Sequence, residues 1–290
     1  MAARLTDRPG RRSEPKVVAR VTFGPGHGSR PAPNVGPVST TSTRPARRTI
    51  RQFVPPQHGA WAMLLLPYLA GLLVAGFRWP DLPLLCAWLA GYLLSYYVFL
   101  AVKSRRPGRY LPQFRLYGLV AVPAGAIVLA AEPRLLWFAP VYAVLLAVNA
   151  WYAWRRRERA LLNDLASVAQ SCLVIGVVTV IAGGRPADTW AASVLVLLYL
   201  TGTVLHVKTM IRERGSRTYR TASVGYHLAA LAAVTVISIP AALVFALLTV
   251  RAWVLPGRSL TPKRVGFVEI GASVLVLAAV ALVGRPPFAI

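Results

Sequence analysis

The amino-acid sequence predicts an all-α membrane protein that crosses the bilayer about nine times. Hydrophobic residues make up 56% of the 290 residues, and the mean hydropathy is +0.54. A soluble fold of this size has too little interior to bury so much apolar surface. The apolar residues form segments close to the roughly 20 residues that a helix needs to cross the hydrocarbon. Basic residues fall in every second gap between these segments, as expected of a multi-pass protein.

Nine candidate spans follow one another at 60–77, 81–102, 113–131, 135–154, 162–182, 189–208, 222–238, 240–255 and 266–283. The preceding residues 1–52 are rich in Arg, Pro, Gly, Ser and Thr and have no apolar periodicity, so we expect a disordered tail before one membrane domain, 53–290. The tail lacks the apolar core of a secretory signal, which makes the first span an uncleaved anchor. It either binds anionic headgroups or is an extension from a wrongly assigned start codon.

The gaps between the spans alternate between strongly basic and nearly neutral. The basic gaps carry Lys103, Arg105, Arg106, Arg109 and Arg115, then Arg155, Arg156, Arg157 and Arg159, then Lys208, Arg212, Arg214, Arg217 and Arg220, then Arg251, Arg258, Lys263 and Arg264. The neutral gaps carry Arg78 with Asp81, Glu132 with Arg134, Arg185 with Asp188, and no charge at 238–240. Short loops rich in Lys and Arg stay in the cytoplasm. We therefore expect a cytoplasmic N-terminus, an external C-terminus and a location in the bacterial cytoplasmic membrane.

The stretch 222–255 allows either one long helix or two short spans. As one helix, its 34 residues would extend roughly 50 Å, well beyond a hydrocarbon core of about 30 Å. One helix would also place Arg251 and the bases after it outside, against the orientation rule. We expect two spans hinged near Pro240.

The net charge of +24 does not predict nucleic-acid binding, because the tail and the basic gaps hold nearly all of the 33 Lys and Arg residues, where orientation requires them. Cys86 and Cys172 lie within predicted spans and lack the spacing of a redox or metal motif. We expect two buried structural thiols, no metal site and no cofactor.

Candidate functional residues gather at the cytoplasmic ends of the spans. His58 lies one turn before the first span and either carries a proton or binds an anion, or serves with Trp61 as an interfacial anchor. Arg106 and Arg109 follow the second span. They either contribute to a phosphate cradle or complement the helix dipole and the orientation rule.

The start of the fifth span combines arginines with a carboxylate. Arg159 precedes Asn163 and Asp164, and one of the latter two is expected as the N-cap. Glu158 would pair with a neighbouring arginine. The alternative is that the carboxylate of Asp164, surrounded by arginines, helps to define a polar pocket.

The end of the sixth span has the densest polar face next to the membrane. The residues that share this face on a continuing helix are His206, Thr209, Arg212 and Glu213. His206 and Lys208 fall in the last apolar turn, where a charged group is costly unless it snorkels or meets a partner. Glu269, in the first turn of the ninth span, is the candidate partner from the same side of the membrane.

Four stretches resemble the YwiC-like family of bacterial membrane proteins, over residues 53–283. They read PPQHGAWAMLLLPYLAGLL, ERALLNDLASVAQS, KTMIRERGSRTYR and RVGFVEI. RRPGR at 105–109 and WRRRERALLNDLASVAQS are more distantly similar to the UbiA prenyltransferases, which implies a nine-helix bundle with a site on the cytoplasmic face. Where that family holds magnesium diphosphate with aspartates, GYLLSYYVFLAVKSRRP and VLHVKTMIRERGS carry Lys and Arg. Because Mg²⁺ prefers carboxylate oxygens, this departure argues against metal-dependent prenyl transfer.

We expect a UbiA-like scaffold in which a cationic pocket on the cytoplasmic face replaces the acidic metal site. It would bind an anionic lipid, an isoprenoid phosphate or a quinone-like molecule through Lys208 and Arg212, while His58 or His206 moves a proton beside Glu213. A small-anion transporter is one alternative, although the polar residues gather at one face and no inverted repeat is evident. A membrane-embedded assembly partner without a ligand is the other. Membrane lipids, and not nucleic acid, are the expected partners.

Overall fold

Nine α-helices make up most of the described chain, and they lie close to the predicted spans. The structure, a computed structural model, describes residue 53, residues 58–258 and residues 260–283, with backbone only for 58–60. The helices are α2 (His58–Ala75), α3 (Asp81–Ser104), α4 (Leu111–Ala131), α5 (Ala139–Trp154), α6 (Leu161–Ile181), α7 (Trp190–Val207), α8 (Arg217–Ile237), α9 (Ile239–Val254) and α10 (Pro262–Leu282). The predicted disordered tail, 1–52, lies outside these residues.

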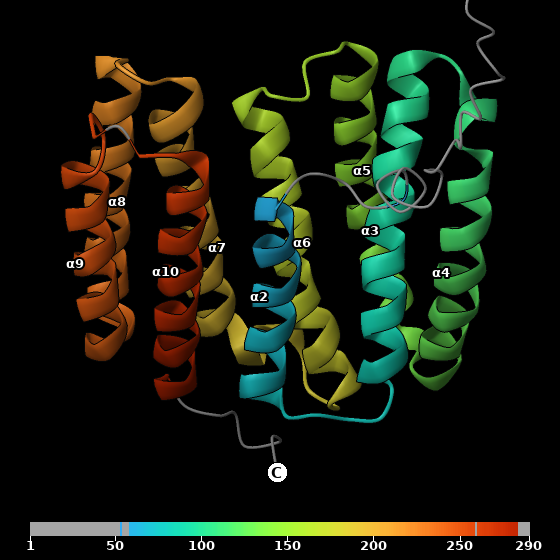
Figure 1. The fold of residues 1–290 in the computed structure, drawn as a ribbon. Helices are drawn as coiled ribbons and strands as arrows, with labels where there is room; N and C mark the ends of the chain where they lie inside the picture. The colour runs from blue at the N-terminus through green and yellow to red at the C-terminus, as the bar shows by residue number, and fades with distance from the viewer. Residues whose placement is uncertain (1–52, 54–57, 259, 284–290) are drawn as a thin grey trace, which may run out of the picture. The chain divides into compact units, whose positions relative to one another are not determined.

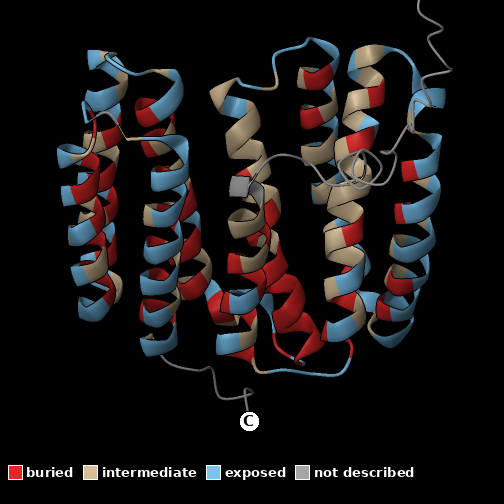
Figure 2. Cartoon of the chain, viewed as in Figure 1, coloured by how far each residue is buried: buried red, intermediate tan, exposed pale blue. Residues whose placement is uncertain are grey.

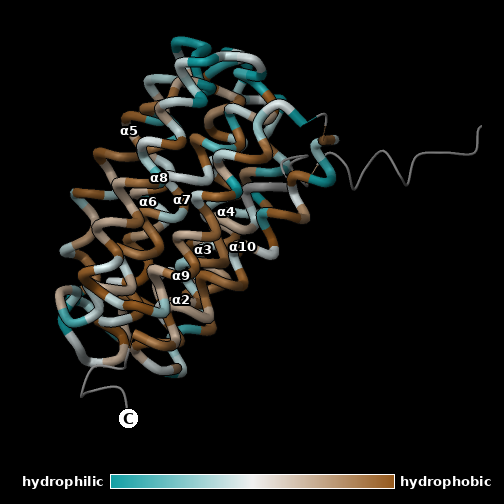
Figure 3. Tube along the Cα trace, turned by 90° about the vertical axis from the view of Figure 1, so that its left-hand side faces the viewer, coloured by the Kyte–Doolittle hydropathy of each residue, from teal (hydrophilic) through white to brown (hydrophobic). Residues whose placement is uncertain are grey.

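Length and composition identify the chain as an all-α multi-pass membrane protein. Seven helical segments of the described residues are long and apolar enough to cross a membrane, and two shorter apolar helices, Trp61–Ala75 and Ile239–Val254, accompany them. Hydrophobic residues occupy the middle of the helices, and hydrophilic residues gather toward their ends (Figure 3).

The predicted break near Pro240 is confirmed. α8 ends at Ile237 and α9 begins at Ile239, and Ser238 between them has an extended backbone with φ −163° and ψ 122°. The Ser238 hydroxyl accepts a hydrogen bond from the Ala241 N–H at 3.4 Å. Pro240 lies in the first turn of α9, where the missing N–H costs no hydrogen bond. α8 and α9 therefore form a tightly packed antiparallel hairpin (Figure 1).

α2 and α6 lie between two groups of helices (Figure 1). One group contains α3, α4 and α5, and the other contains α7, α8, α9 and α10. α2 packs against both α6 and α10, which brings the first described helix beside the last. The connections α3 to α4, α5 to α6, α7 to α8 and α9 to α10 lie at one end of the helices (Figure 1), which we call the basic end because it carries the basic gaps.

α6 is the most enclosed of the spanning helices. Of its apolar window 61% is buried, against 11% for the segment Pro133–Trp154, and buried residues cover much of its length (Figure 2). Gly71 of α2 permits the close approach of α6, because a Cβ at this position would lie 3.0 Å from the Cβ of Val178. A small residue is what allows two helix backbones to pack this closely in a membrane.

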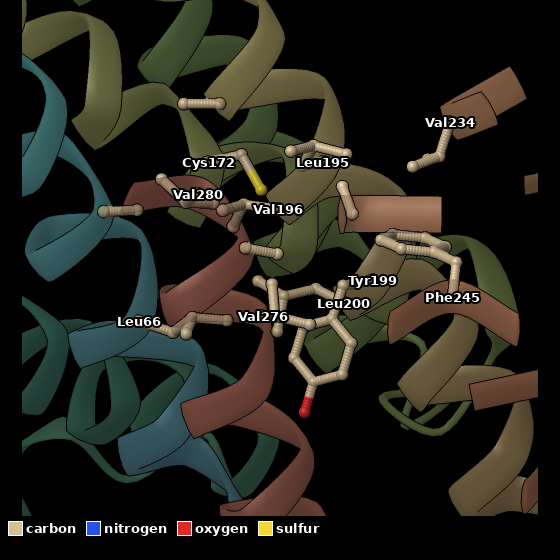
Figure 4. Close-up of a cluster of buried hydrophobic side chains, with 14 of the residues drawn as sticks. Leu66, Cys172, Leu195, Val196, Tyr199, Leu200, Val234, Phe245, Val276 and Val280 are labelled. Atoms are coloured by element: carbon tan, nitrogen blue, oxygen red, sulfur yellow. The ribbon is translucent and has the colours of Figure 1, made fainter. Parts of the chain in front are cut away.

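An apolar cluster joins α2 and α6 to α7, α8, α9 and α10 (Figure 4). Cys172 is buried in this cluster, as predicted. The prediction for Cys86 is wrong, because that thiol is exposed. Cys86 shares a face of α3 with Leu82, four residues earlier, and Leu82 is 60% exposed. This face of α3 therefore points outward, where lipid replaces protein packing.

Candidate functional site

Lys208, at the end of α7, links this helix to α6 and to the loop before α6. Its Nζ lies 2.8 Å from Asp164 Oδ2 and donates to the carbonyl oxygen of Arg159 at 2.7 Å. Lys208 is only 5% exposed. The structure thus brings together three of the predicted site residues, and it shows that the charge of Lys208 is already matched by a carboxylate.

The predicted common face of His206, Thr209, Arg212 and Glu213 is wrong. A π-turn covers Lys208–Arg212 and is closed by the Glu213 N–H, which donates to the Lys208 carbonyl oxygen at 2.7 Å. Because each bond of a π-turn spans five residues instead of four, the side chains after it change direction. His206 and Thr209 are buried, whereas Arg212 is exposed and Glu213 is half-buried.

The predicted N-cap of α6 is also wrong. Ala160 occupies the N-cap position with an extended backbone, and Asn163 and Asp164 lie within the first turn. The Asn163 side chain donates instead to the carbonyl oxygen of Glu158 at 2.8 Å, and Asp164 binds Lys208. Neither side chain therefore caps the backbone N–H groups of the first turn. The Asp164 carboxylate still interacts favourably with the positive end of the helix dipole.

A pocket of about 500 Å³ opens beside this link at the basic end. It is lined by Lys103, Arg156, Arg157, Glu158, Arg159 and Ala160. Lys103 Nζ lies 2.7 Å from Glu158 Oε1, so Glu158 pairs with a lysine from the end of α3 and not with a neighbouring arginine as predicted. Within the described chain, no carboxylate lies at ion-pairing distance from Arg156, Arg157 or Arg159.

The pocket keeps a positive charge at neutral pH. Burial alone would raise the pKa of Glu158, but the hydrogen bond from Lys103 and the charges of Lys103 and Arg159 together hold this pKa below its usual value. Glu158 is therefore ionised and neutralises only one of the four basic side chains of the lining.

Aromatic residues mark the level of the pocket relative to the bilayer. The Arg155 guanidinium lies over the rings of Trp151 and Trp154, at 5.2 and 5.5 Å from their centroids. Trp151 and Trp154 are 47% and 53% exposed. Tryptophan is enriched where the hydrocarbon meets the headgroups, so this end of α5 has the character of a membrane interface.

Other predicted residues lie away from the pocket. Arg106, Arg109 and Arg212 are exposed and do not line it. His58 begins α2, but its side chain lies outside the described residues. Among the side chains that the structure describes, no group of three His, Cys, Asp or Glu residues is arranged to hold a metal ion.

A second polar cluster lies buried between α7, α9 and α10. Arg251 Nη1 donates to both carboxylate oxygens of Glu269, at 2.8 Å and 2.7 Å. Thr203 Oγ1 donates to Glu269 Oε2 at 3.1 Å, and His206 Nε2 lies 3.9 Å from Glu269 Oε1. Glu269 therefore lies beside His206, as predicted, but its closest ionic partner is Arg251.

Sequence reasoning assigned Arg251 to membrane orientation alone. In the structure it lies in the last turn of α9 and is 8% exposed. The available signal was that Arg251 and Glu269 each interrupt an apolar stretch, TVRAWV and GFVEIG. Opposite charges within spanning helices commonly pair with each other.

Further hydrogen bonds fix the position of Glu269 and its surroundings. The Tyr199 ring lies in the apolar cluster with its hydroxyl pointing away from the cluster (Figure 4). This hydroxyl donates to the Glu269 carbonyl oxygen at 3.2 Å and lies 2.9 Å from Ser273 Oγ. On α8, His227 Nδ1 lies 2.7 Å from the Ser223 carbonyl oxygen.

Comparisons with known proteins agree with the sequence motifs. The model of the family described as YwiC-like protein matches residues 54–180. The chain is 34% identical over 236 residues to "Uncharacterized protein YwiC" from Bacillus subtilis, covering 80% of this chain and 98% of that protein. It is 33% identical over 217 residues to an "Uncharacterized protein" from Haemophilus influenzae, covering 73% of this chain and 90% of that protein. No solved structure matches. The chain belongs to the YwiC-like family.

Proposed function

We propose that this protein binds the anionic headgroup of a lipid or isoprenoid phosphate in the pocket at the basic end, on the cytoplasmic face of the bacterial cytoplasmic membrane. The observation that carries the proposal is the pocket lining. Arg156, Arg157 and Arg159 surround a hollow whose one carboxylate, Glu158, is already paired. Planar guanidinium groups match the oxygens of a phosphate with two parallel hydrogen bonds. The lipid chains would extend into the bilayer beside Trp151 and Trp154.

The orientation rule explains the basic charge of this loop but not its fixed shape. Lys103 ties the loop to the end of α3 through Glu158. Lys208 ties the loop to the end of α7 through the Arg159 carbonyl, and it also binds Asp164 in the first turn of α6. A loop that serves topology alone needs charge but no such attachments, whereas a binding loop gains affinity when its arginines are held in place before the ligand arrives. In this proposal Lys208 positions the pocket, and Arg156, Arg157 and Arg159 contact the anion.

Binding of phosphatidylglycerol to the purified full chain in detergent, measured by native mass spectrometry against phosphatidylcholine, tests the proposal. The triple variant Arg156→Gln, Arg157→Gln, Arg159→Gln should bind phosphatidylglycerol about tenfold more weakly, a loss of roughly 1.4 kcal/mol. The matched control Arg105→Gln, Arg106→Gln, Arg109→Gln removes the same charge from exposed positions at the same end and should change binding by less than about twofold.

An equal loss in the two triple variants would mean that only the overall charge matters, and the pocket would then have no specific role. Competition with inorganic phosphate distinguishes a site for free phosphate from a site for a lipid headgroup. Displacement by phosphate indicates a site for free phosphate, and retention of the lipid indicates a site for the whole headgroup.

A further inference from the structure

Arg251 presents an unused edge of its guanidinium group inside the protein. Nη1 makes both bonds to Glu269, while Nε and Nη2 are buried and have no hydrogen-bond partner among the described residues. The N–H groups of Nε and Nη2 point in parallel along one edge of the planar group, which is the fork that arginine uses to hold oxygen ligands. Buried donors without an acceptor are costly, so this fork is suited to an oxygen atom supplied by another molecule.

The existing ion pair indicates which kind of oxygen fits. Glu269 already neutralises Arg251, so a second full negative charge would lack a counter-ion in a region of low dielectric constant. Lys208, the other buried cation that the structure describes at this end, is already paired with Asp164. A neutral carbonyl oxygen accepts hydrogen bonds from both prongs of the fork without adding charge.

His206 adds further hydrogen-bonding capacity beside the ion pair. It is 0% exposed, and neither of its ring nitrogens has a hydrogen-bond partner in the described part of the chain. A neutral imidazole has one donor and one acceptor nitrogen, so His206 can bind a second polar atom of the same ligand. Two neighbouring side chains with unused polar atoms distinguish this cluster from a self-contained structural ion pair.

Large apolar side chains close to Arg251 and Glu269 in the sequence are exposed. On α9, Val250 and Trp253 flank Arg251 and are 52% and 63% exposed; on α10, Phe267 is 63% exposed. Arg251 itself keeps 8% of its surface accessible. From the free fork, the balanced charge and this lipid-facing surface, we propose that Arg251 binds the carbonyl group of a neutral lipophile, such as an acyl ester. This site is separate from the pocket at Arg156 and does not depend on it.

The probe is methyl oleate labelled with ¹³C at its carbonyl, added to the full chain in a maltoside detergent that has no carbonyl groups. Infrared difference spectra should show a carbonyl band shifted to lower frequency, because hydrogen bonds from the fork weaken the C=O bond. Arg251→Lys keeps the charge opposite Glu269 but lacks the fork, so the shifted band should disappear and affinity should fall at least tenfold. The control Arg258→Lys, at an exposed position of the following loop, should keep both.

A photoactivatable diazirine ester provides a test that needs no variant. Its cross-links to the wild-type chain should fall on peptides of α7, α9 and α10, and cross-links confined to other helices would overturn the proposal. An unshifted carbonyl band, an unchanged Arg251→Lys variant, or tighter binding of the oleate anion than of its ester would also overturn it. The triple arginine variant of the pocket should leave ester binding unchanged, so the two proposals can fail independently.

Discussion

Lys208 and Arg251 differ in their surroundings from an exposed basic residue of the same membrane face. Both belong to the charge pattern that predicts orientation, yet they are 5% and 8% exposed, and each binds a carboxylate from another helix. Arg258 follows Arg251 in the same basic gap and is exposed. The pattern of charges could not separate these residues, because burial depends on which helix packs alongside, and that information is not local in the sequence.

The Glu269→Gln substitution should destabilise the protein strongly. It leaves the Arg251 charge buried without a counter-ion, which costs about 3–5 kcal/mol in comparable buried pairs. Replacing both residues, as in Arg251→Leu with Glu269→Leu, should restore most of this loss, because no charge then remains unpaired. Thermal unfolding in detergent measures both effects. The control Glu132→Gln breaks an exposed pair with Arg134 and should hardly change the Tm.

At the scale of helices, the spans were largely predictable and the details of their ends were not. Apolar runs located the nine helices to within a few residues, and the charge argument placed the break at Pro240 correctly. The π-turn at Lys208–Arg212 and the Ala160 N-cap were not predictable. Lys208 in the π-turn binds Asp164, and Asn163 binds the Glu158 carbonyl oxygen, and helix propensity does not encode these contacts.

Gly71→Val should weaken the packing of α2 on α6. The new side chain would collide with Val178, whose Cβ lies 3.0 Å from the position of a Cβ at residue 71, and overpacking of this kind costs about 1–3 kcal/mol. The Tm in detergent should fall accordingly. Gly91→Val is the matched control, since nothing lies within 4 Å of its Cβ position. An equal loss at both positions would show that helix propensity, and not close packing, decides the effect.

At the scale of the whole molecule, the alternation of basic and neutral connections predicts that the basic end faces the cytoplasm. Single cysteines introduced in a Cys86→Ser, Cys172→Ser background test this orientation. Gly108→Cys lies at the basic end and Ala187→Cys in the α6 to α7 connection, both at exposed positions. A membrane-impermeant maleimide added to intact cells should label only residue 187. Labelling of residue 108 alone would show that the basic end lies outside the cell. The pocket would then not face the cytoplasm, which would contradict the proposed function.

The candidate site was predictable in its contacts more than in its shape. The sequence indicated Glu269 as a candidate partner for the polar residues at the end of the sixth span, and its carboxylate lies 3.9 Å from His206 Nε2. It indicated basic residues around Asp164, and Lys208 is among them. It did not indicate that Arg156 and Arg157 line a pocket with Lys103. A hollow depends on how a loop and a helix end meet, which requires the tertiary arrangement.

The contact of α2 with both α6 and α10 has a consequence for biosynthesis. The ribosome delivers α2 first among the described helices and α10 last, so α2 must wait in the membrane with one face uncovered until nearly the whole chain has been inserted. Glu269 arrives on that same final helix. Until it arrives, Arg251 has no carboxylate, and a chain truncated before residue 262 would expose both defects to membrane quality control. Completion of the bundle and neutralisation of its buried arginine therefore occur in a single step.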